Sequence, residues 1–448
     1  MGIDSNNLYE KLKRFQRNTK SEASADQEPT ASVSKKPLPD ALRHIPGVVP
    51  ASQLRGEKQR LIELRDAFLA SIGVRILSEG EGGTYGLRSR FYSAQEIPPS
   101  WPEITGAELA LQSRDPQFAS LYLQDILFID TETTGLAGGT GTVPFLIGVG
   151  CFADGGFWVH QFLMRDYNEE TAVLDAFERM AQRFRAMATY NGKSFDLPLL
   201  ETRFALNRKR TRLSGLPHLD LLYMARRLWK RLLPDCSLST VESGILGRMR
   251  ALDVPGEQIP YIYFDFLRGI RIQRMEAVLA HNAEDLLSLA LLIDKTCRMA
   301  RDPLSECGHG WELFAMARCF VETEAWEPAC FCLEEALARR SLAGDHRLSV
   351  YKALSWLYKR MGRLEKSEAL WLQMMEEASD PYPYIELAKY YEHAKRMYSE
   401  ALRRTEAALE ILNHPEYFGE GGRGSRAMLL QELRHRKKRL LGKLRKKD

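Results

Sequence analysis

Hydrophobic positions predict three β-strands in the first half of the chain. Residues 126–133, 144–152 and 156–164 are short apolar runs rich in β-branched and aromatic side chains. Glycine-containing turns join them, and short connections of this kind link antiparallel neighbours. The pattern therefore predicts a three-stranded antiparallel meander.

Beyond these strands the hydrophobic spacing becomes mainly helical. Residues 168–184 predict a helix, residues 186–192 one further strand, and the chain from 197 to 299 a series of helices. This order of elements indicates an α/β domain, in which helices cover a sheet. We expect the domain to span residues 120–300.

Two segments precede this domain. Residues 1–55 mix Ser, Lys, Pro, Asn and Gln with few apolar positions. Because so little burial cannot offset the entropy of ordering the chain, we expect a disordered N-terminal arm. Residues 56–119 hold one helical pattern, followed by a stretch rich in glycine and proline. We expect this extension to pack on the domain that follows.

A spacing of small and bulky residues recurs three times between residues 308 and 415. Small residues where two helices touch are typical of tetratricopeptide repeats, which stack into an all-α solenoid. A generic helical bundle with coincidental spacing is the alternative. The three sets are Ala317, Phe320, Ala329, Leu333 and Ala336; Ser355, Tyr358, Ser367, Trp371 and Met374; and Ala388, Tyr391, Ala401, Thr405 and Ala408.

The composition is that of a globular protein. Hydrophobic residues make up 44% and charged residues 27% of the 448 positions, so most of the chain can bury a core. No apolar run is long enough to cross a membrane, and the first residues lack the order of a signal peptide, so we expect a soluble, cytoplasmic protein without membrane contact. Seven scattered cysteines without paired CxxC motifs favour reduced thiols over zinc or disulfides.

Positive charge is concentrated in a basic C-terminal tail, residues 420–448. Positions 431–448 carry nine Lys or Arg against two acids, Glu432 and Asp448. Such a tail can neutralise phosphates of a nucleic acid and release their counterions. A solvated helix end that aids solubility explains the charges equally well, so both interpretations stay open.

Two acidic residues end the first predicted strand. Strand side chains alternate between faces, so Asp130 and Glu132 point the same way and Thr131 the opposite way. Like charges held this close repel each other, and a divalent cation between them would relieve the repulsion. The pair is compatible with a metal site, although a solvated strand end is the commoner explanation of such a pair alone.

Two further acids lie in contexts that complete the set. Asp196 follows the predicted strand at 186–192 and precedes a helix, where Asp is also common as an N-cap. His281 and Asp285 are four residues apart in a helical segment and share one face. A histidine there can activate a water at neutral pH, whereas an ordinary surface histidine is the alternative.

The order of these residues resembles a known superfamily. DTETTGL (130–136), YNGKSFDLPLL (190–200) and HNAEDLLSL (281–289) are similar to the three motifs of the DEDD exonucleases, which have a ribonuclease H-like fold. The glycine-rich stretch after the first motif, NGKSFD and HNxxD resemble more closely the YprB-like ribonuclease H-fold family. Members of that family often carry C-terminal tetratricopeptide repeats. The resemblance implies a mixed sheet with flanking helices, followed by a repeat solenoid.

The resemblance also implies an activity, a 3′–5′ exonuclease that hydrolyses phosphodiester bonds of DNA or RNA. It assigns two Mg²⁺ or Mn²⁺ ions to Asp130, Glu132, Asp196 and Asp285, and all-oxygen ligands suit such hard cations. Ions about 3.5 to 4 Å apart stabilise the attacking and leaving oxygens. His281 is implied as the general base, at the four-residue spacing of the tyrosine-type enzymes rather than the five of the histidine type.

Further residues match substrate-contacting positions in the resemblance. Thr133, Gly135 and Leu136 belong to the first motif and are expected at the terminal nucleotide, although a structural turn explains Gly135 equally well. Asn191 and Lys193 in the second motif are expected within reach of a phosphate.

Three functions stay open at this point. The first is a metal-dependent nuclease that acts on a single-stranded end of DNA or RNA, with the repeats binding a protein partner or the substrate. The second is a nucleic-acid-binding module whose nuclease fold is weakly active or inactive. The third is an adaptor in which the repeats carry the main function.

Overall fold

The computed structural model describes residues 51–78, 83–97, 101–135, 140–250, 253–377, 379–414 and 422–445. The chain divides into two units, residues 1–59 and 60–448. Most of the predicted disordered arm, residues 1–50, lies outside the described residues. Residues 51–55 begin helix α2 (Ala51–Ser71), whose first part is all that is described of the first unit.

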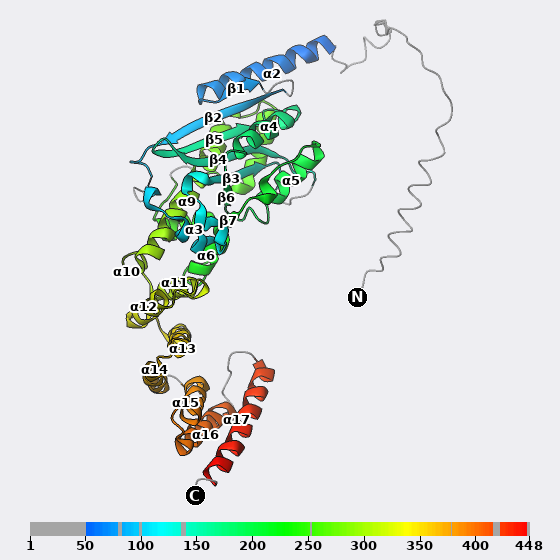
Figure 1. The fold of residues 1–448 in the computed structure, drawn as a ribbon. Helices are drawn as coiled ribbons and strands as arrows, with labels where there is room; N and C mark the ends of the chain where they lie inside the picture. Colours follow the sequence, from blue (N-terminus) through cyan, green and yellow to red (C-terminus); the bar gives the residue numbers. More distant parts are fainter. Residues whose placement is uncertain are drawn as a thin grey trace, which may run out of the picture. The chain divides into compact units, whose positions relative to one another are not determined.

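The second unit is built on a mixed sheet with the strand order β1-β2-β5-β4-β3-β6-β7 (Figure 1). β3, β4 and β5 form the predicted antiparallel meander, and β6 and β7 continue the sheet in parallel with β3. The strands are β1 (Arg75–Ser78), β2 (Thr84–Tyr92), β3 (Ile126–Thr133), β4 (Pro144–Ala153), β5 (Gly156–Leu163), β6 (Ala186–Thr189) and β7 (His218–Asp220).

Three of these strands were not predicted from the hydrophobic pattern. β1 and β2 lie in the extension before residue 120, and β2 pairs with β5 from Gly86 to Tyr92, so the extension belongs to the sheet. Ser89, Arg90 and Phe91 of β2 are exposed and Arg88 is half-buried, so the strand lacks the apolar run by which a strand is predicted. β7 is three residues long and runs directly into a helix, so its pattern merged with the helical one.

Helices cover both faces of the sheet. Leu127 and Ile129 of β3 lie in one apolar cluster with α4, α5 and α8, whereas Ile126 and Phe128 lie in a second cluster with α3, α6 and α9. Asp130 continues the row of Ile126 and Phe128, so it faces α9. The helices are α3 (Gly106–Ser113), α4 (Glu170–Ala181), α5 (Asp196–Leu206), α6 (Leu221–Trp229), α8 (Ile259–Leu267) and α9 (Met275–Arg301).

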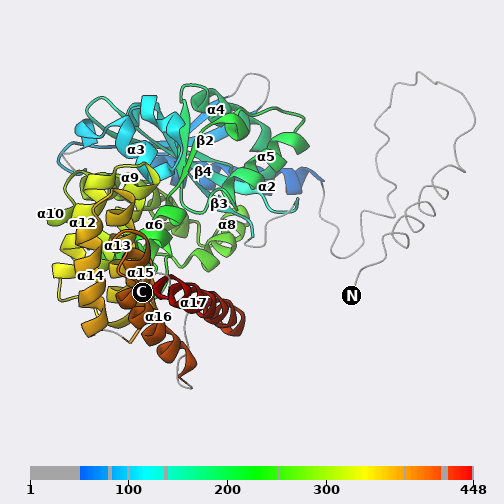
Figure 2. The ribbon, with the colours of Figure 1, turned by 60° about the horizontal axis from the view of Figure 1, so that its bottom comes forward.

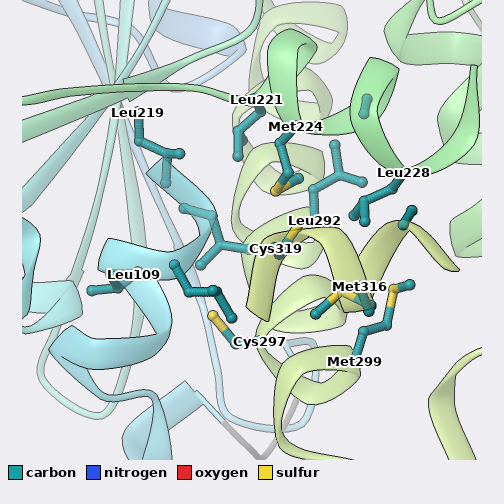
Figure 3. Close-up of a cluster of buried hydrophobic side chains, with 14 of the residues drawn as sticks. Leu109, Leu219, Leu221, Met224, Leu228, Leu292, Cys297, Met299, Met316 and Cys319 are labelled. Atoms are coloured by element: carbon teal, nitrogen blue, oxygen red, sulfur yellow. The ribbon is translucent and has the colours of Figure 1, made fainter. Parts of the chain in front are cut away.

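The second cluster continues into the C-terminal helices. Leu109 of α3, Met224 of α6 and Cys297 of α9 lie in one buried cluster with Met316 of α11 (Gly310–Glu322), as Figure 3 shows. Removal of these apolar side chains from water stabilises the contact by about 25 cal/mol per Å². The first C-terminal helix therefore shares a core with the α/β domain instead of following it on a free linker.

Each helix after α11 packs on the next one along the chain (Figure 2). Small residues of the predicted repeat pattern, including Ala329, Ser355, Ser367 and Ala388, are fully buried. Among the described residues, no helix combines the length and the apolar character needed to cross a membrane. The helices are α12 (Trp326–Ala338), α13 (Gly344–Arg360), α14 (Leu364–Glu377), α15 (Pro381–His393), α16 (Tyr398–Asn413) and α17 (Gly422–Leu444).

The basic C-terminal segment forms most of helix α17, which packs on α16. Leu440 is buried, and Arg436, Arg439 and Lys443 all donate hydrogen bonds to the buried carboxylate of Glu392 in α15. Three of the basic side chains thus stabilise the packing of α17 near α15. Neither phosphate binding nor a solvated helix end, the two interpretations of the tail, predicts this role.

Candidate active site

The end of β3 brings two carboxylates to the face that α9 covers. Asp130 pairs in register with Gly148 of β4, and Glu132 with Leu146. The register shifts between Glu132 and Thr133, where the strand ends. Asp130 and Glu132 share a face as the sequence predicted, and Glu132 is buried.

Asp196 joins this pair from the first turn of α5. The residue at the N-cap is Phe195, so Asp196 is not the helix cap that its sequence context also allowed. Its side chain is buried and accepts a hydrogen bond of 2.5 Å from the hydroxyl of Thr131 in β3. This bond fixes Asp196 against the strand that carries Asp130 and Glu132.

Asn282 of α9 holds the carboxylate of Asp130. Its side-chain amide donates to Asp130 Oδ2 at 2.7 Å, and its Oδ1 accepts from Gln161 Nε2 at 2.8 Å. Asn282 is fully buried directly over Gly148, where an added Cβ would lie 2.2 Å from Asn282 Oδ1. Asn282 was not predicted as a site residue from the sequence. Its place in HNxxD, one residue after the histidine, was the available signal.

His281 faces the acids with one ring nitrogen and an aspartate with the other. Nε2 lies 3.6 Å from Asp285 Oδ2 and 3.9 Å from Glu132 Oε1, and Nδ1 lies 2.6 Å from Asp253 Oδ1. Because a carboxylate only accepts, Nδ1 carries the proton in this contact, which is shorter than the 3.2 Å approach of Arg250 Nη1 to the same nitrogen. Burial lowers the pKa of His281, but the charges of Asp285 and Glu132 raise it above its usual value, and Nε2 is the acceptor toward the cluster when the ring is neutral. Asp253 was not predicted from the sequence.

Arg250 is a second unpredicted member of the site. Its guanidinium makes a bidentate ion pair with Glu242, a buried residue that follows helix α7 (Leu238–Val241), through hydrogen bonds of 2.9 and 2.6 Å. It also donates to Asp285 Oδ1. Asp285 is therefore partly neutralised by a cation of the chain itself.

Burial and repulsion oppose ionisation of the four acids. Burial, followed by the charges of Asp285 and Glu132, raises the pKa of Asp130 well above its usual range. Burial also raises the pKa of Glu132 to about 8 and that of Asp196 to about 6. The pKa of Asp285 is raised by burial even though His281 and Arg250 oppose the shift. Arg250 and His281 therefore do not balance the negative charge that the four carboxylates carry when they are ionised.

The chemistry of the donor set fits hard divalent cations. Asp130, Glu132, Asp196 and Asp285 offer oxygen atoms only, which Mg²⁺ and Mn²⁺ prefer. Among the described residues, however, no group of three or more His, Cys, Asp or Glu side chains is arranged to hold a metal ion. Three of the acids already accept hydrogen bonds from side chains of the protein. Asp196 accepts from Thr131, Asp130 from Asn282 and Asp285 from Arg250. Metal ligation by these residues therefore stays a proposal.

The predicted substrate-contacting residues lie at two places. Thr133 is buried, and its hydroxyl donates to the carbonyl of Gly135 at 2.8 Å, which supports a turn. Leu136 lies outside the described residues. Asn191 and Lys193 are exposed in the loop before α5, and Asn191 has a left-handed backbone (φ +64°). No contact with a substrate follows from these positions alone.

Asp220 stabilises that loop. It caps the N-terminus of α6, and its two carboxylate oxygens accept from the backbone nitrogens of Asn191 at 2.8 Å and Lys193 at 3.0 Å. These bonds give Asp220 a structural role.

A protein family and a solved structure are similar to this chain. Residues 127–297 match the RNase_H superfamily, which confirms the predicted ribonuclease H-like domain. The family B DNA polymerase from the hyperthermophilic archaeon Pyrobaculum calidifontis is similar over 44% of this chain and 29% of its own, at 16% identity and a TM-score of 0.31.

A close relative covers most of the chain. The uncharacterized protein YprB of Bacillus subtilis (strain 168) is 36% identical over 330 residues, which are 72% of this chain and 77% of that protein. An identity of this size over both chains, together with the superfamily domain at residues 127–297, places the protein in the family of YprB.

Proposed function

We propose that this protein is a metal-dependent nuclease that hydrolyses phosphodiester bonds of DNA or RNA from the 3′ end of a single strand. One observation carries the proposal. Three distant segments bring Asp130, Glu132, Asp196 and Asp285 into one electrostatically interacting cluster, and His281 Nε2 faces two of these acids. The RNase_H superfamily match supports the same class of chemistry.

The four acids would hold two Mg²⁺ or Mn²⁺ ions. Such ions, when bound, supply the positive charge that stabilises the attacking and leaving oxygens at phosphorus. The bond from Asn282 keeps Asp130 turned toward the cluster, and the Thr131 hydroxyl does the same for Asp196. Both contacts orient carboxylates that a nucleic acid must approach closely.

His281 would act as the general base. Its Nε2 takes a proton from a water molecule, and the water oxygen bonds to phosphorus. The P–O3′ bond breaks, which releases a nucleoside 5′-monophosphate, and the O3′ left on the shortened strand takes a proton from solvent to become a hydroxyl. Asp253 stabilises the ring tautomer that leaves Nε2 free to accept this proton. The aspartate therefore acts as a positioning residue.

The C-terminal helices would form three tetratricopeptide repeats that bind a protein partner. Support comes from the burial of small residues at matching positions of alternate helices, such as Ala329 in α12 and Ser367 in α14. In such repeats, a continuous row of helices presents an extended surface for binding.

A nuclease assay tests the activity directly. End-labelled single-stranded DNA and RNA would be incubated with Mg²⁺ or Mn²⁺ and wild-type protein, Asp130→Ala, Asp285→Ala or the exposed acidic control Glu257→Ala. We expect wild type and the control to shorten the strands stepwise from the 3′ end. Both cluster variants should be inactive while they still bind the strands in Ca²⁺. Intact substrates of all kinds with wild type and Mn²⁺ would argue against the proposal.

The ion pair between Arg250 and Asp285 favours a second candidate function, a nucleic-acid-binding protein without hydrolytic activity. A guanidinium that permanently occupies Asp285 would remove one ligand from the metal site. Strand binding by wild type without cleavage in either metal would favour this candidate.

A further inference from the structure

A polar pocket lies beside the loop that carries the second motif. It has a volume of about 350 Å³, within the range of small-ligand sites. Its walls come from the end of α3, the loop before α5, strand β7 and helix α6. The lining residues that matter here are Gln112, Arg114, Lys193, Asp220, Tyr223 and Arg227.

The pocket opens on the same edge of the sheet as the acids. β3, β6 and β7 are parallel neighbours, so their carboxyl ends lie at one edge, where ligands of α/β sheets commonly bind. β7 is two strands from β3, a separation of about 10 Å. The bonds from Asp220 to the backbone of Asn191 and Lys193 fix one wall of the pocket to the loop that leads into Asp196.

Positive charge dominates the lining. The lining contains three basic residues, Arg114, Lys193 and Arg227, and one acidic residue, Asp220. The carboxylate of Asp220 accepts hydrogen bonds from the backbone nitrogens of Asn191, Lys193 and Leu222. Arg114 also pairs at 2.6 Å with Glu322, which does not line the pocket. The lining therefore carries an excess of positive charge that attracts an anion.

Two buried polar atoms of the lining residues are unsatisfied. Among the described residues, Arg227 Nε has no acceptor and Gln112 Oε1 has no donor, although Gln112 is only 3% exposed. A buried polar atom without a partner is costly, and a polar ligand or water in the pocket would supply one.

An exposed tyrosine ring lies beside the basic side chains of the pocket. Tyr223 is 51% exposed, and Lys193 Nζ lies 5.8 Å from the centre of its ring. Aromatic rings beside basic side chains are typical of surfaces that bind single-stranded nucleic acids, because bases stack on the ring while cations contact the phosphates.

We infer that this pocket holds one nucleotide of a single-stranded nucleic acid, a few positions away from the phosphodiester bound at the acid cluster. Tyr223 stacks on the base, and Lys193 and Arg114 contact the phosphate. The inference deepens the proposed function and rests on it, since the strand must run along the sheet edge from the acids to the pocket.

A binding experiment without hydrolysis tests the inference. Fluorescence anisotropy of a labelled single-stranded 12-mer would be measured in EDTA with wild type, Tyr223→Ala and Lys193→Gln. Matched controls are Tyr122→Ala, another exposed tyrosine, and Arg185→Gln. Tyr122 precedes the amino end of β3 and Arg185 that of β6, at the opposite edge of the sheet.

We expect Tyr223→Ala to weaken binding by about tenfold. Lys193→Gln should weaken binding and lower the slope of log affinity against log salt by about 0.7, the value of one single-strand phosphate contact. The controls should match wild type. Unchanged affinity and slope in both pocket variants, no binding by wild type, or displacement by a free mononucleotide as efficient as by an unlabelled 12-mer would each overturn the inference.

The readout separates this inference from the proposed function. Cleavage by wild type together with unaltered binding in the pocket variants would support the nuclease function and would contradict nucleotide binding in the pocket. Weakened binding in the pocket variants without cleavage by wild type would support the pocket and count against the nuclease.

Discussion

Asn282 Nδ2 donates a 2.7 Å hydrogen bond to Asp130 Oδ2, although the two residues are 152 positions apart in the chain. The same amide accepts from Gln161, whose Nε2 also donates to the carbonyl of Leu279 at 2.7 Å. Gly148 makes room for this arrangement because it has no side chain. One strand residue of the site is thus oriented by the helix that carries His281 and Asp285.

This relationship predicts that Asn282→Ala lowers the nuclease rate without unfolding the protein. Loss of a residue that orients a metal-binding side chain typically costs about tenfold to a hundredfold in activity or metal affinity. Gly148→Ala should have a similar effect, because the new Cβ would displace Asn282. Rates and melting temperatures would be compared with Gly215→Ala, where an added Cβ meets nothing within 4 Å. A normal rate in both Asn282→Ala and Gly148→Ala would show that Asn282 does not orient Asp130 for the reaction.

The contact between Asp253 and His281 predicts that Asp253→Asn lowers kcat by about tenfold or more while KM stays near that of wild type. An amide at this position can also donate to Nδ1, which would favour the wrong tautomer. Steady-state kinetics on a single-stranded substrate would give both constants.

The double variant Asp253→Asn with His281→Ala is the control for this role. Because Asp253 acts through His281, the double variant should be no slower than His281→Ala alone. A further loss of rate in the double variant would show that Asp253 acts elsewhere.

Arg250 competes with cations for Asp285, so its removal should tighten metal binding. We expect Arg250→Met, made together with Glu242→Gln to avoid an unpaired buried charge, to strengthen Mn²⁺ binding by about tenfold, the equivalent of one hydrogen bond to a charged group. Isothermal titration calorimetry without substrate measures this affinity. Arg248→Met is the matched control, because Arg248 pairs with Glu284 instead of the cluster. Weaker Mn²⁺ binding in the double variant would mean that Arg250 holds Asp285 in place for the metal.

The ion pairs of Glu392 predict an acid-sensitive contact between α17 and α15. Burial alone would raise the pKa of Glu392, but hydrogen bonds from Arg439 and Lys443 and the charges of Arg439 and Arg436 lower it to about 2. A lowered folded-state pKa stabilises the fold above the unfolded-state value of about 4.5, and this stabilisation is lost as the pH falls toward about 2.

The matched substitution is Glu392→Gln. At about pH 7 we expect it to lower the free energy of unfolding by roughly 2 to 3 kcal/mol, and the difference from wild type should shrink at about pH 3. Denaturant unfolding at both pH values measures the difference. A gap between the two proteins that is equally large at both pH values would contradict the role given to the carboxylate.

The sequence by itself determined the local geometry of the site. The alternation of β3 placed Asp130 and Glu132 on one face, and the helical spacing of α9 placed His281 and Asp285 on another. The meander and the α/β domain were predicted for the same reason, since the period of apolar residues reports which side of a strand or helix is buried. The order of the acids then supplied the resemblance to a family.

Only the tertiary structure decided which residues surround the acids. Asn282 meets Asp130, Asp253 meets His281 and Arg250 meets Asp285 because separate elements pack together, and no period within one element encodes such contacts. Strand β2, which lies between β1 and β5, escaped prediction because partly exposed strands need few apolar residues. Periodicity describes one element at a time, whereas contacts between polar partners that are 28 to 152 residues apart depend on how the hydrophobic faces of all elements pack together.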